Sequence, residues 1–168
     1  MTIMMLIFDL DGTLFQAKPV FRLAGEGVDF SLEKLLDSVS AAGELFPGAF
    51  EVVQLLHTAG YRMYICSQSP AAYIEKVLEH TGISRFFEGY KSAEGYDSKS
   101  KPIRELAQGH PAIVIGDTHG DITAAKQNGM KSIAVMYGYG NKALLAPADA
   151  FAESPGGIVR CVEWIMRL

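Results

Sequence analysis

Two aspartates stand two residues apart where an apolar run meets a glycine. Asp9 and Asp11 follow Leu6–Phe8 and precede Gly12. An extended chain places residues i and i+2 on the same side, so both carboxylates can emerge at the carboxyl edge of a sheet, where α/β proteins bind ligands. One carboxylate can then attack while the other moves protons. Asp11-Gly12 is also an ordinary turn dipeptide, so these residues alone leave a structural turn open.

A second acidic pair follows a later apolar run. Asp117 and Asp121 come after Ala112–Ile115, and in a parallel sheet they would share an edge with Asp9. Carboxylates gathered there repel one another unless a hard cation lies among them, and oxygen-only ligands suit Mg²⁺. We predict a magnesium site made by Asp9 and Asp117, with Asp121 nearby. In the alternative interpretation, Asp117 caps the next helix and Asp121 is solvated.

A serine and two lysines could supply contacts to an anion. Ser67 ends a predicted strand directly before a predicted helix, whose N–H groups and dipole favour an anion. A simple turn residue fits the same position. Lys99 and Lys101 precede another helical pattern, and either could balance the negative charge of the site or lie on the surface.

Short apolar runs alternate with helical patterns along the chain, which predicts a Rossmann-like, doubly wound parallel sheet of five strands. The first, second and fourth runs are apolar enough to be buried on both faces. The five predicted strands are Ile3–Phe8, Tyr61–Cys66, roughly Phe86–Tyr90, Ala112–Ile115 and Ser132–Met136.

The intervening segments predict helices with recognisable ends. In the second of them, Ser69 is expected as the N-cap and Pro70 as the first helical residue. The tail after Gly138 is predicted to be loop-rich before its last helix. The expected helices lie between Gly48 and Gly60, between Pro70 and Gly82, over Asp121–Asn128 and over Ile158–Leu168.

An insertion of roughly thirty residues, from about 15 to 45, separates the first strand from the first of these helices. It contains one clear helical pattern, with Ser31 as the cap and an apolar side that includes Leu35 and Val39. We expect a small helical lid here, reduced in size.

Composition narrows the class of protein. With 168 residues, 49% of them hydrophobic and 20% charged, the chain is expected to form a single domain over residues 1–168. A net charge of −4 without a basic cluster argues against nucleic-acid binding. The apolar start has no basic leader and is interrupted by aspartates, so we expect a cytoplasmic protein with no membrane partner. Cys66 and Cys161 are expected to be buried thiols.

Four of these features occur in the order of the motifs of the haloacid dehalogenase superfamily, which the chain resembles over nearly its whole length. They are DLDGT at 9–13, Ser67, a lysine at 99 or 101, and GDTHGD at 116–121. The first and last motifs are specific to this superfamily. The serine and the lysine are common residues that support the resemblance only because they occur in the expected order. FPGAFEVVQLLHTAGYRMYICS and AAKQNGMKSIAVMYGYG further resemble the phosphoglycolate-phosphatase-like branch.

The resemblance implies a Mg²⁺-dependent phosphatase that works through an aspartyl-phosphate. Asp9 would be the nucleophile, and Asp11 would protonate the leaving oxygen and then activate water. Mg²⁺ would bind the Asp9 carboxylate, the backbone carbonyl of Asp11, and Asp117, with Asp121 beside them.

The resemblance also implies the ligands of the phosphoryl group. Ser67 and the motif lysine would hold its oxygens, and Gly12 and Gln68 are further candidates. Lys99 is favoured over Lys101, because apolar helical residues follow it at the family's usual spacing of four and seven positions. Gln68 stands where this branch often has asparagine, and His119 occupies a variable position that we expect in a loop.

The length of the insertion affects which substrates could enter the site that the resemblance implies. A small-molecule phosphoester is expected, and a larger one becomes possible with an open site or with a partner subunit that covers it. A phosphomutase would need a lid that holds a sugar phosphate during its reorientation, which the short insertion disfavours. A non-catalytic protein that binds a phosphorylated ligand is the other alternative, although it would not need the complete acidic set.

Overall fold

A computed structural model describes residues 2–25 and 30–168. Its strands form one sheet in the order β3-β2-β1-β4-β5-β6, and every neighbouring pair is parallel. The predicted α/β class is confirmed, but the predicted number of five strands is wrong. The six strands are β1 (Met5–Phe8), β2 (Arg62–Ser67), β3 (Gly89–Ser92), β4 (Ala112–Gly116), β5 (Lys131–Val135) and β6 (Ala150–Ala152).

The additional strand, β6, lies in the tail that was predicted to be loop-rich. Its sequence is only Ala-Phe-Ala, which is too short to show a hydrophobic period. It is defined by its pairing with β5, in which Ile133 lies opposite Ala150, and by the packing of α7 (Pro155–Met166) against it. A strand that depends on such tertiary contacts leaves little signal in its own residues.

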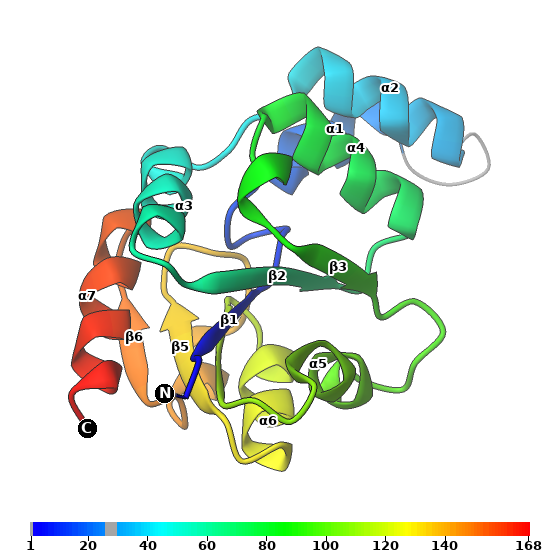
Figure 1. The fold of residues 1–168 in the computed structure, drawn as a ribbon. Helices are drawn as coiled ribbons and strands as arrows, with labels where there is room; N and C mark the ends of the chain where they lie inside the picture. Colours follow the sequence, from blue (N-terminus) through cyan, green and yellow to red (C-terminus); the bar gives the residue numbers. More distant parts are fainter. Residues whose placement is uncertain (1, 26–29) are drawn as a thin grey trace.

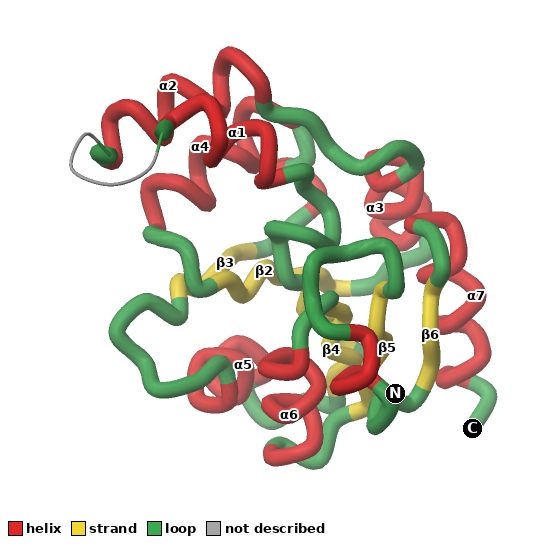
Figure 2. The backbone as a smooth tube through the Cα atoms, turned by 180° about the vertical axis from the view of Figure 1, so that it is seen from behind, coloured by secondary structure: helices red, strands yellow, loops and turns green. Residues whose placement is uncertain are grey.

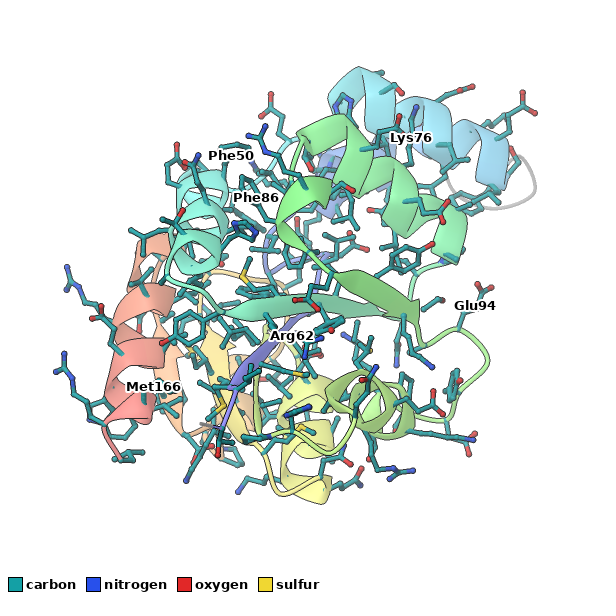
Figure 3. The ribbon with its side chains drawn as sticks, viewed as in Figure 1. Phe50, Arg62, Lys76, Phe86, Glu94 and Met166 are labelled. Atoms are coloured by element: carbon teal, nitrogen blue, oxygen red, sulfur yellow. The ribbon has the colours of Figure 1, made fainter. Side chains whose placement is uncertain are left out.

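The third strand begins later than predicted. Phe86 belongs instead to a short 3₁₀ turn, η2 (Ser84–Phe86), and β3 starts at Gly89. The Phe86 ring packs edge to face on Phe50 of α3 (Ala49–Thr58), with ring centroids 5.6 Å apart (Figure 3). Phe86 is therefore apolar because it contributes to the core, not because it lies in a strand.

Helices cover both faces of the sheet (Figures 1 and 2). Leu6 and Phe8 point to the face that carries α3, α4 (Ala71–Thr81) and α7, whereas Met5 and Ile7 point to α5 (Ser100–Ala107) and α6 (His119–Gln127). This alternation buries β1 completely, as its unbroken apolar run predicted. The doubly wound arrangement is thereby confirmed.

The order of the strands fixes where a ligand site can form. Strands β2 and β4 flank β1 on either side, so the chain order reverses between β1 and β4. Phe8 lies opposite Ile115 in that pair, which brings the residues after both strands together. Such a switch point at the carboxyl edge is where doubly wound sheets bind their ligands.

Three helix starts differ from the predictions, and in the last of them α7 begins at Pro155 rather than at Ile158. Pro70 is the N-cap of α4, and Ser69 makes no capping bond because its side chain is engaged elsewhere. The next difference is in α6, which begins at His119, a residue that was expected in a loop. Thr118 is its N-cap and shares a reciprocal capping box with Asp121.

The insertion between β1 and α3 contains α1 (Ala17–Ala24) and α2 (Leu32–Ala42). The helix α2 was predicted, and the Ser31 hydroxyl caps it by accepting a bond from Lys34 N. The helix α1 was not recognised, because it has only 8 residues and contains Pro19, a residue that disfavours helix. Both helices pack beside α4 in Figure 1, and residues 26–29 of the predicted insertion lie outside the described residues.

Further expectations concern membrane spans and cysteines. Among the described helices, none is long and apolar enough to cross a membrane. Both cysteines are free thiols. Cys66 is buried as predicted, but Cys161 is only partly buried.

Candidate active site

A polar cavity of about 350 Å³ opens at the switch point of the sheet. Its walls come from the end of β2, from the segments that follow β1, β2 and β4, and from the residue that precedes α5. Among the described residues, α1 and α2 contribute none of its lining. The lining residues are Asp9, Asp11, Ser67, Gln68, Ser69, Lys99, Thr118 and Gly120.

Three buried carboxylates cluster together, and Asp9 is the member of the cluster that lines the cavity. One oxygen from each of Asp9, Asp117 and Asp121 lies within 4.8 Å of the others. The Thr13 hydroxyl lies between two of them, 3.3 Å from Asp9 Oδ2 and 3.2 Å from Asp117 Oδ1. A compact set of oxygen ligands with excess negative charge fits a divalent metal ion.

Lys99 is the buried cation of this cluster. Its ammonium group donates to Asp9 Oδ1 and to Asp121 Oδ1, each at 2.7 Å. Lys99 is the N-cap of α5, and Ile103 one turn later is buried against the sheet. Lys101 is exposed, with its ammonium 6.0 Å from the centre of the Tyr96 ring. The structure therefore brings Lys99, and not Lys101, to the acidic residues.

Asp121 is held from two sides. Its Oδ2 accepts bonds from Thr118 N at 3.1 Å and from Thr118 Oγ1 at 2.8 Å, while Oδ1 faces Lys99. Its side chain lies so close to Gly116 that a Cβ there would come within 2.2 Å of Asp121 Cγ. Asp121 is 1% exposed, so it is not the solvated residue of the alternative interpretation.

Asp117 lies in a tight cradle of backbone. Tyr139 N donates to Asp117 Oδ2 at 2.8 Å. A Cβ on Gly138 would come within 2.3 Å of Asp117 Cβ, and one on Gly140 within 1.9 Å of the Asp117 carbonyl oxygen. These glycines were not predicted as site residues, since a glycine-rich tail carries no sign of its distant partner.

Gly12 also packs tightly against the Asp117 side chain. Its φ of +82° suits glycine, and a Cβ there would come within 2.1 Å of Asp117 Oδ2. Its N–H donates to the carbonyl oxygen of Phe15 at 2.9 Å, and Gly12 does not line the cavity. The structure thus gives Gly12 a steric contact with Asp117 and no N–H directed at a phosphate.

The remaining predicted residues differ in their placement. Ser67 is buried in the cavity wall, where its Oγ accepts a 3.1 Å bond from Ser69 N. Gln68 is exposed at the rim. His119 is also exposed, with Nε2 3.2 Å from Thr123 Oγ1, and does not line the cavity.

Asp11 has two partners that were not predicted. Ser69 Oγ donates to its Oδ2 at 2.9 Å, and the Tyr73 hydroxyl donates to its Oδ1 at 2.7 Å. Ser69 was interpreted as a helix cap, and a tyrosine in an apolar helix pattern is typical of the core. No pattern within the sequence links either residue to an aspartate about sixty positions away.

Burial dominates the electrostatics of the site. Desolvation raises the pKa of Asp9 to about 7, although Lys99 acts in the opposite direction. Desolvation likewise raises the pKa of Asp11 to about 6, against the hydrogen bonds from Tyr73 and Ser69. Burial alone would lower the pKa of Lys99, but Asp121 and Asp9 together hold it above its ordinary value. The site therefore disfavours further negative charge and keeps its lysine protonated.

A Rossmann-like sheet with a buried carboxylate cluster at its switch point defines a class of α/β protein whose acidic residues fit a divalent metal ion. Comparison with known families makes the assignment specific. The chain belongs to the haloacid dehalogenase-like hydrolase family, whose model matches residues 20–129, more than half of the chain. A second, HAD-hydrolase-like model matches residues 100–159. These matches include Ser67, Lys99 and Asp117, and the first begins after Asp9 and Asp11.

Curated relatives include phosphoglycolate phosphatases. That of Vibrio parahaemolyticus is 27% identical over 103 residues, which cover 56% of this chain and 45% of the relative. That of Synechococcus elongatus is 27% identical over 143 residues, which cover 81% of this chain and 68% of the relative. The resemblance to this branch is therefore confirmed. The chain spans about half the length of several of these relatives.

Solved structures share the fold over almost the whole chain. A predicted phosphatase from Clostridium acetobutylicum has a TM-score of 0.75 and 20% identity, with full coverage of both chains. A haloacid dehalogenase-like family hydrolase from Streptococcus pneumoniae has a TM-score of 0.76 and 21% identity, over 95% of this chain and 98% of the other. At these identities the similarity establishes the fold.

Proposed function

We propose that this protein is a Mg²⁺-dependent phosphatase that hydrolyses a small phosphomonoester through an aspartyl-phosphate. The observation that carries this proposal is that Asp9, Asp11 and Lys99 line one cavity, while the buried Asp117 and Asp121 cluster with Asp9 behind its wall. The phosphatase names of the relatives give it further support.

Asp9 is the proposed nucleophile. One of its carboxylate oxygens would attack phosphorus, forming an O–P bond as the bond to the leaving oxygen breaks. Lys99 contacts Asp9 Oδ1 at 2.7 Å, whereas Oδ2 has the longer 3.3 Å contact with the Thr13 hydroxyl, which supports an orientation in which Oδ2 makes this attack or binds the metal ion. Lys99 and the Ser67 hydroxyl would stabilise the charge that accumulates on the phosphoryl oxygens.

Asp11 is the proposed general acid and base. It would give a proton to the leaving oxygen and afterwards take one from the water that cleaves the aspartyl-phosphate. A pKa of about 6, raised by burial, supports this exchange because both protonation states are then accessible near neutral pH.

Mg²⁺ is the proposed cofactor. The side chains of Asp9 and Asp117 and the backbone carbonyl of Asp11 would hold it, with Asp121 beside them. When bound, it would draw negative charge off the phosphoryl group and reduce the repulsion between phosphate and carboxylates.

The substrate is proposed to be small, since the cavity of about 350 Å³ suits a metabolite. We also propose that residues 15–45 are a reduced cap on one domain that spans residues 1–168. Because α1 and α2 do not line the cavity, this cap gives no support to a phosphomutase that must retain a reorienting sugar phosphate.

The test is turnover of p-nitrophenyl phosphate by the purified chain with Mg²⁺. Activity is expected, and both EDTA and Asp9→Asn are expected to abolish it. Full activity in Asp9→Asn would exclude Asp9 as the nucleophile. If the unmodified protein binds phosphate with Mg²⁺ but turns over no phosphoester, the non-catalytic alternative replaces this proposal.

A further inference from the structure

Both carboxylate oxygens of Asp11 accept hydrogen bonds from hydroxyl groups, one in the loop before α4 and one in its first turn. Ser69 Oγ lies 2.9 Å from Oδ2, and the Tyr73 hydroxyl lies 2.7 Å from Oδ1. Two donors on opposite oxygens fix the rotation of the carboxyl group as well as its position. Ser69 is itself anchored, because its carbonyl oxygen accepts a 2.7 Å bond from the Ser92 hydroxyl of β3.

The Tyr73 ring is locked by packing. It is 0% exposed, and it contacts Phe15 edge to face with ring centroids 6.4 Å apart. On its other side it meets Phe21 of α1, with centroids 5.8 Å apart. The Phe21 ring in turn stacks on Phe30, which precedes α2. A chain of aromatic contacts therefore runs from the insertion to the hydroxyl that holds Asp11.

We propose that Tyr73, together with Ser69, is a positioning residue that aims Asp11 at the leaving oxygen, and that the insertion braces Tyr73 through Phe21. This inference rests on the proposed function. It assigns the insertion a role in the proton transfer, although none of the described residues of α1 and α2 lines the cavity.

The position of Asp11 matters in the first chemical step, in which the leaving oxygen needs a proton. As the Asp9 O–P bond forms, the P–O bond to the leaving group breaks and its electron pair stays on the leaving oxygen, which takes the proton of Asp11. An aryl oxide leaves readily without that proton, whereas an alkoxide does not. Mispositioning of Asp11 should therefore slow alkyl phosphates much more than aryl phosphates.

The experiment measures kcat/KM for glycerol phosphate and for p-nitrophenyl phosphate, because kcat/KM reports only the steps up to loss of the alcohol. The quantity compared between variants is the ratio of the alkyl value to the aryl value. In Tyr73→Phe, kcat/KM for the alkyl ester is expected to fall about tenfold relative to the aryl ester, the equivalent of one hydrogen bond to a charged group. Ser69→Ala should act in the same direction, and Ser69→Thr, which keeps a hydroxyl, should restore the ratio.

The control for Tyr73→Phe is Tyr90→Phe. The Tyr90 hydroxyl also contacts α4, through Glu75, but lies outside the site, so its loss should leave the ratio unchanged. Phe21→Ala should shift the ratio by about threefold, within the range for coupling through packed side chains. Leu23→Ala, on the same helix but 58% exposed, is its control.

Each outcome separates the two levels of inference. Equal losses of kcat/KM on both esters in Tyr73→Phe would overturn the positioning role. A gain in kcat/KM for the alkyl ester would also overturn it, because Tyr73 would then hold Asp11 away from the substrate. A normal ratio in Phe21→Ala would overturn the brace. No turnover of either ester by the unmodified protein would overturn the proposed function and this inference with it.

Discussion

Replacing Lys99 with methionine tests the electrostatic balance of the site. Lys99 makes two contacts of 2.7 Å, to Asp9 and Asp121, and its side chain is only 7% exposed. Methionine keeps most of the apolar stem of the lysine side chain but removes its charge. The buried carboxylates of Asp9 and Asp121 then have no lysine ammonium beside them. Removing one partner of a buried ion pair costs about 3–5 kcal/mol. We expect a value near the lower end, because Asp121 keeps its bonds from Thr118 and Asp9 keeps its contact with Thr13.

The assay is urea unfolding followed by circular dichroism at pH 8 in EDTA, so that no metal ion compensates for the lost charge. Lys101→Met is the matched control, and it should change the free energy of unfolding by less than about 0.5 kcal/mol because Lys101 is exposed. The loss in Lys99→Met should shrink at pH 5.5, where Asp9, with a pKa of about 7, is protonated in the folded protein. A loss below about 1 kcal/mol at pH 8 would refute the reasoning, since the carboxylates would then not depend on Lys99.

Other predictions concern the nucleophile and the insertion. The raised pKa of Asp9 means that the folded protein binds its proton more tightly than the unfolded chain, so this contribution to stability is complete below pH 4 and is lost as the pH rises through about 7. In EDTA, Asp9→Asn should therefore be more stable than the unmodified protein at pH 8 but not at pH 4, and equal stability at both pH values would contradict the shift. Leu35→Ala should lower the free energy of unfolding by about 2–5 kcal/mol, because Leu35 of α2 is 2% exposed. The exposed Leu32→Ala is its control in the same denaturation series, and equal small losses would show that α2 contributes little to the core.

The residues at the ends of strands could be predicted, because two simple rules place them. Unbroken apolar runs indicate buried parallel strands, and the carboxyl ends of such strands share one edge. Asp9 and Asp117 follow from these rules, since β1 and β4 are both fully buried. The helical register of Ile103 also favoured Lys99 over Lys101, and Lys99 is the lysine that reaches the acidic cluster.

The contacts between distant segments could not be predicted in the same way. Ser69-Pro70 has the local sequence of a helix start, which predicts a capping role for the Ser69 side chain. Nothing in these two residues indicates that the hydroxyl bonds to Asp11 instead. Tyr73 fits the apolar stripe of α4, and only the bend of the chain after β1 brings Asp11 to its hydroxyl. Gly138 likewise depends on a partner in another segment, Asp117. Each of these is a tertiary contact that no local periodicity encodes.

The packing of the insertion limits what it can do as a lid. Val20 of α1 and Leu35 and Val39 of α2 are buried in the same core as α4. Moving the two helices away from α4 as a unit would expose these side chains at a cost of about 1.5–3 kcal/mol each. The same motion would separate Phe21 from Tyr73 and so disturb Asp11. An insertion anchored in this way is suited to hold the site in one geometry.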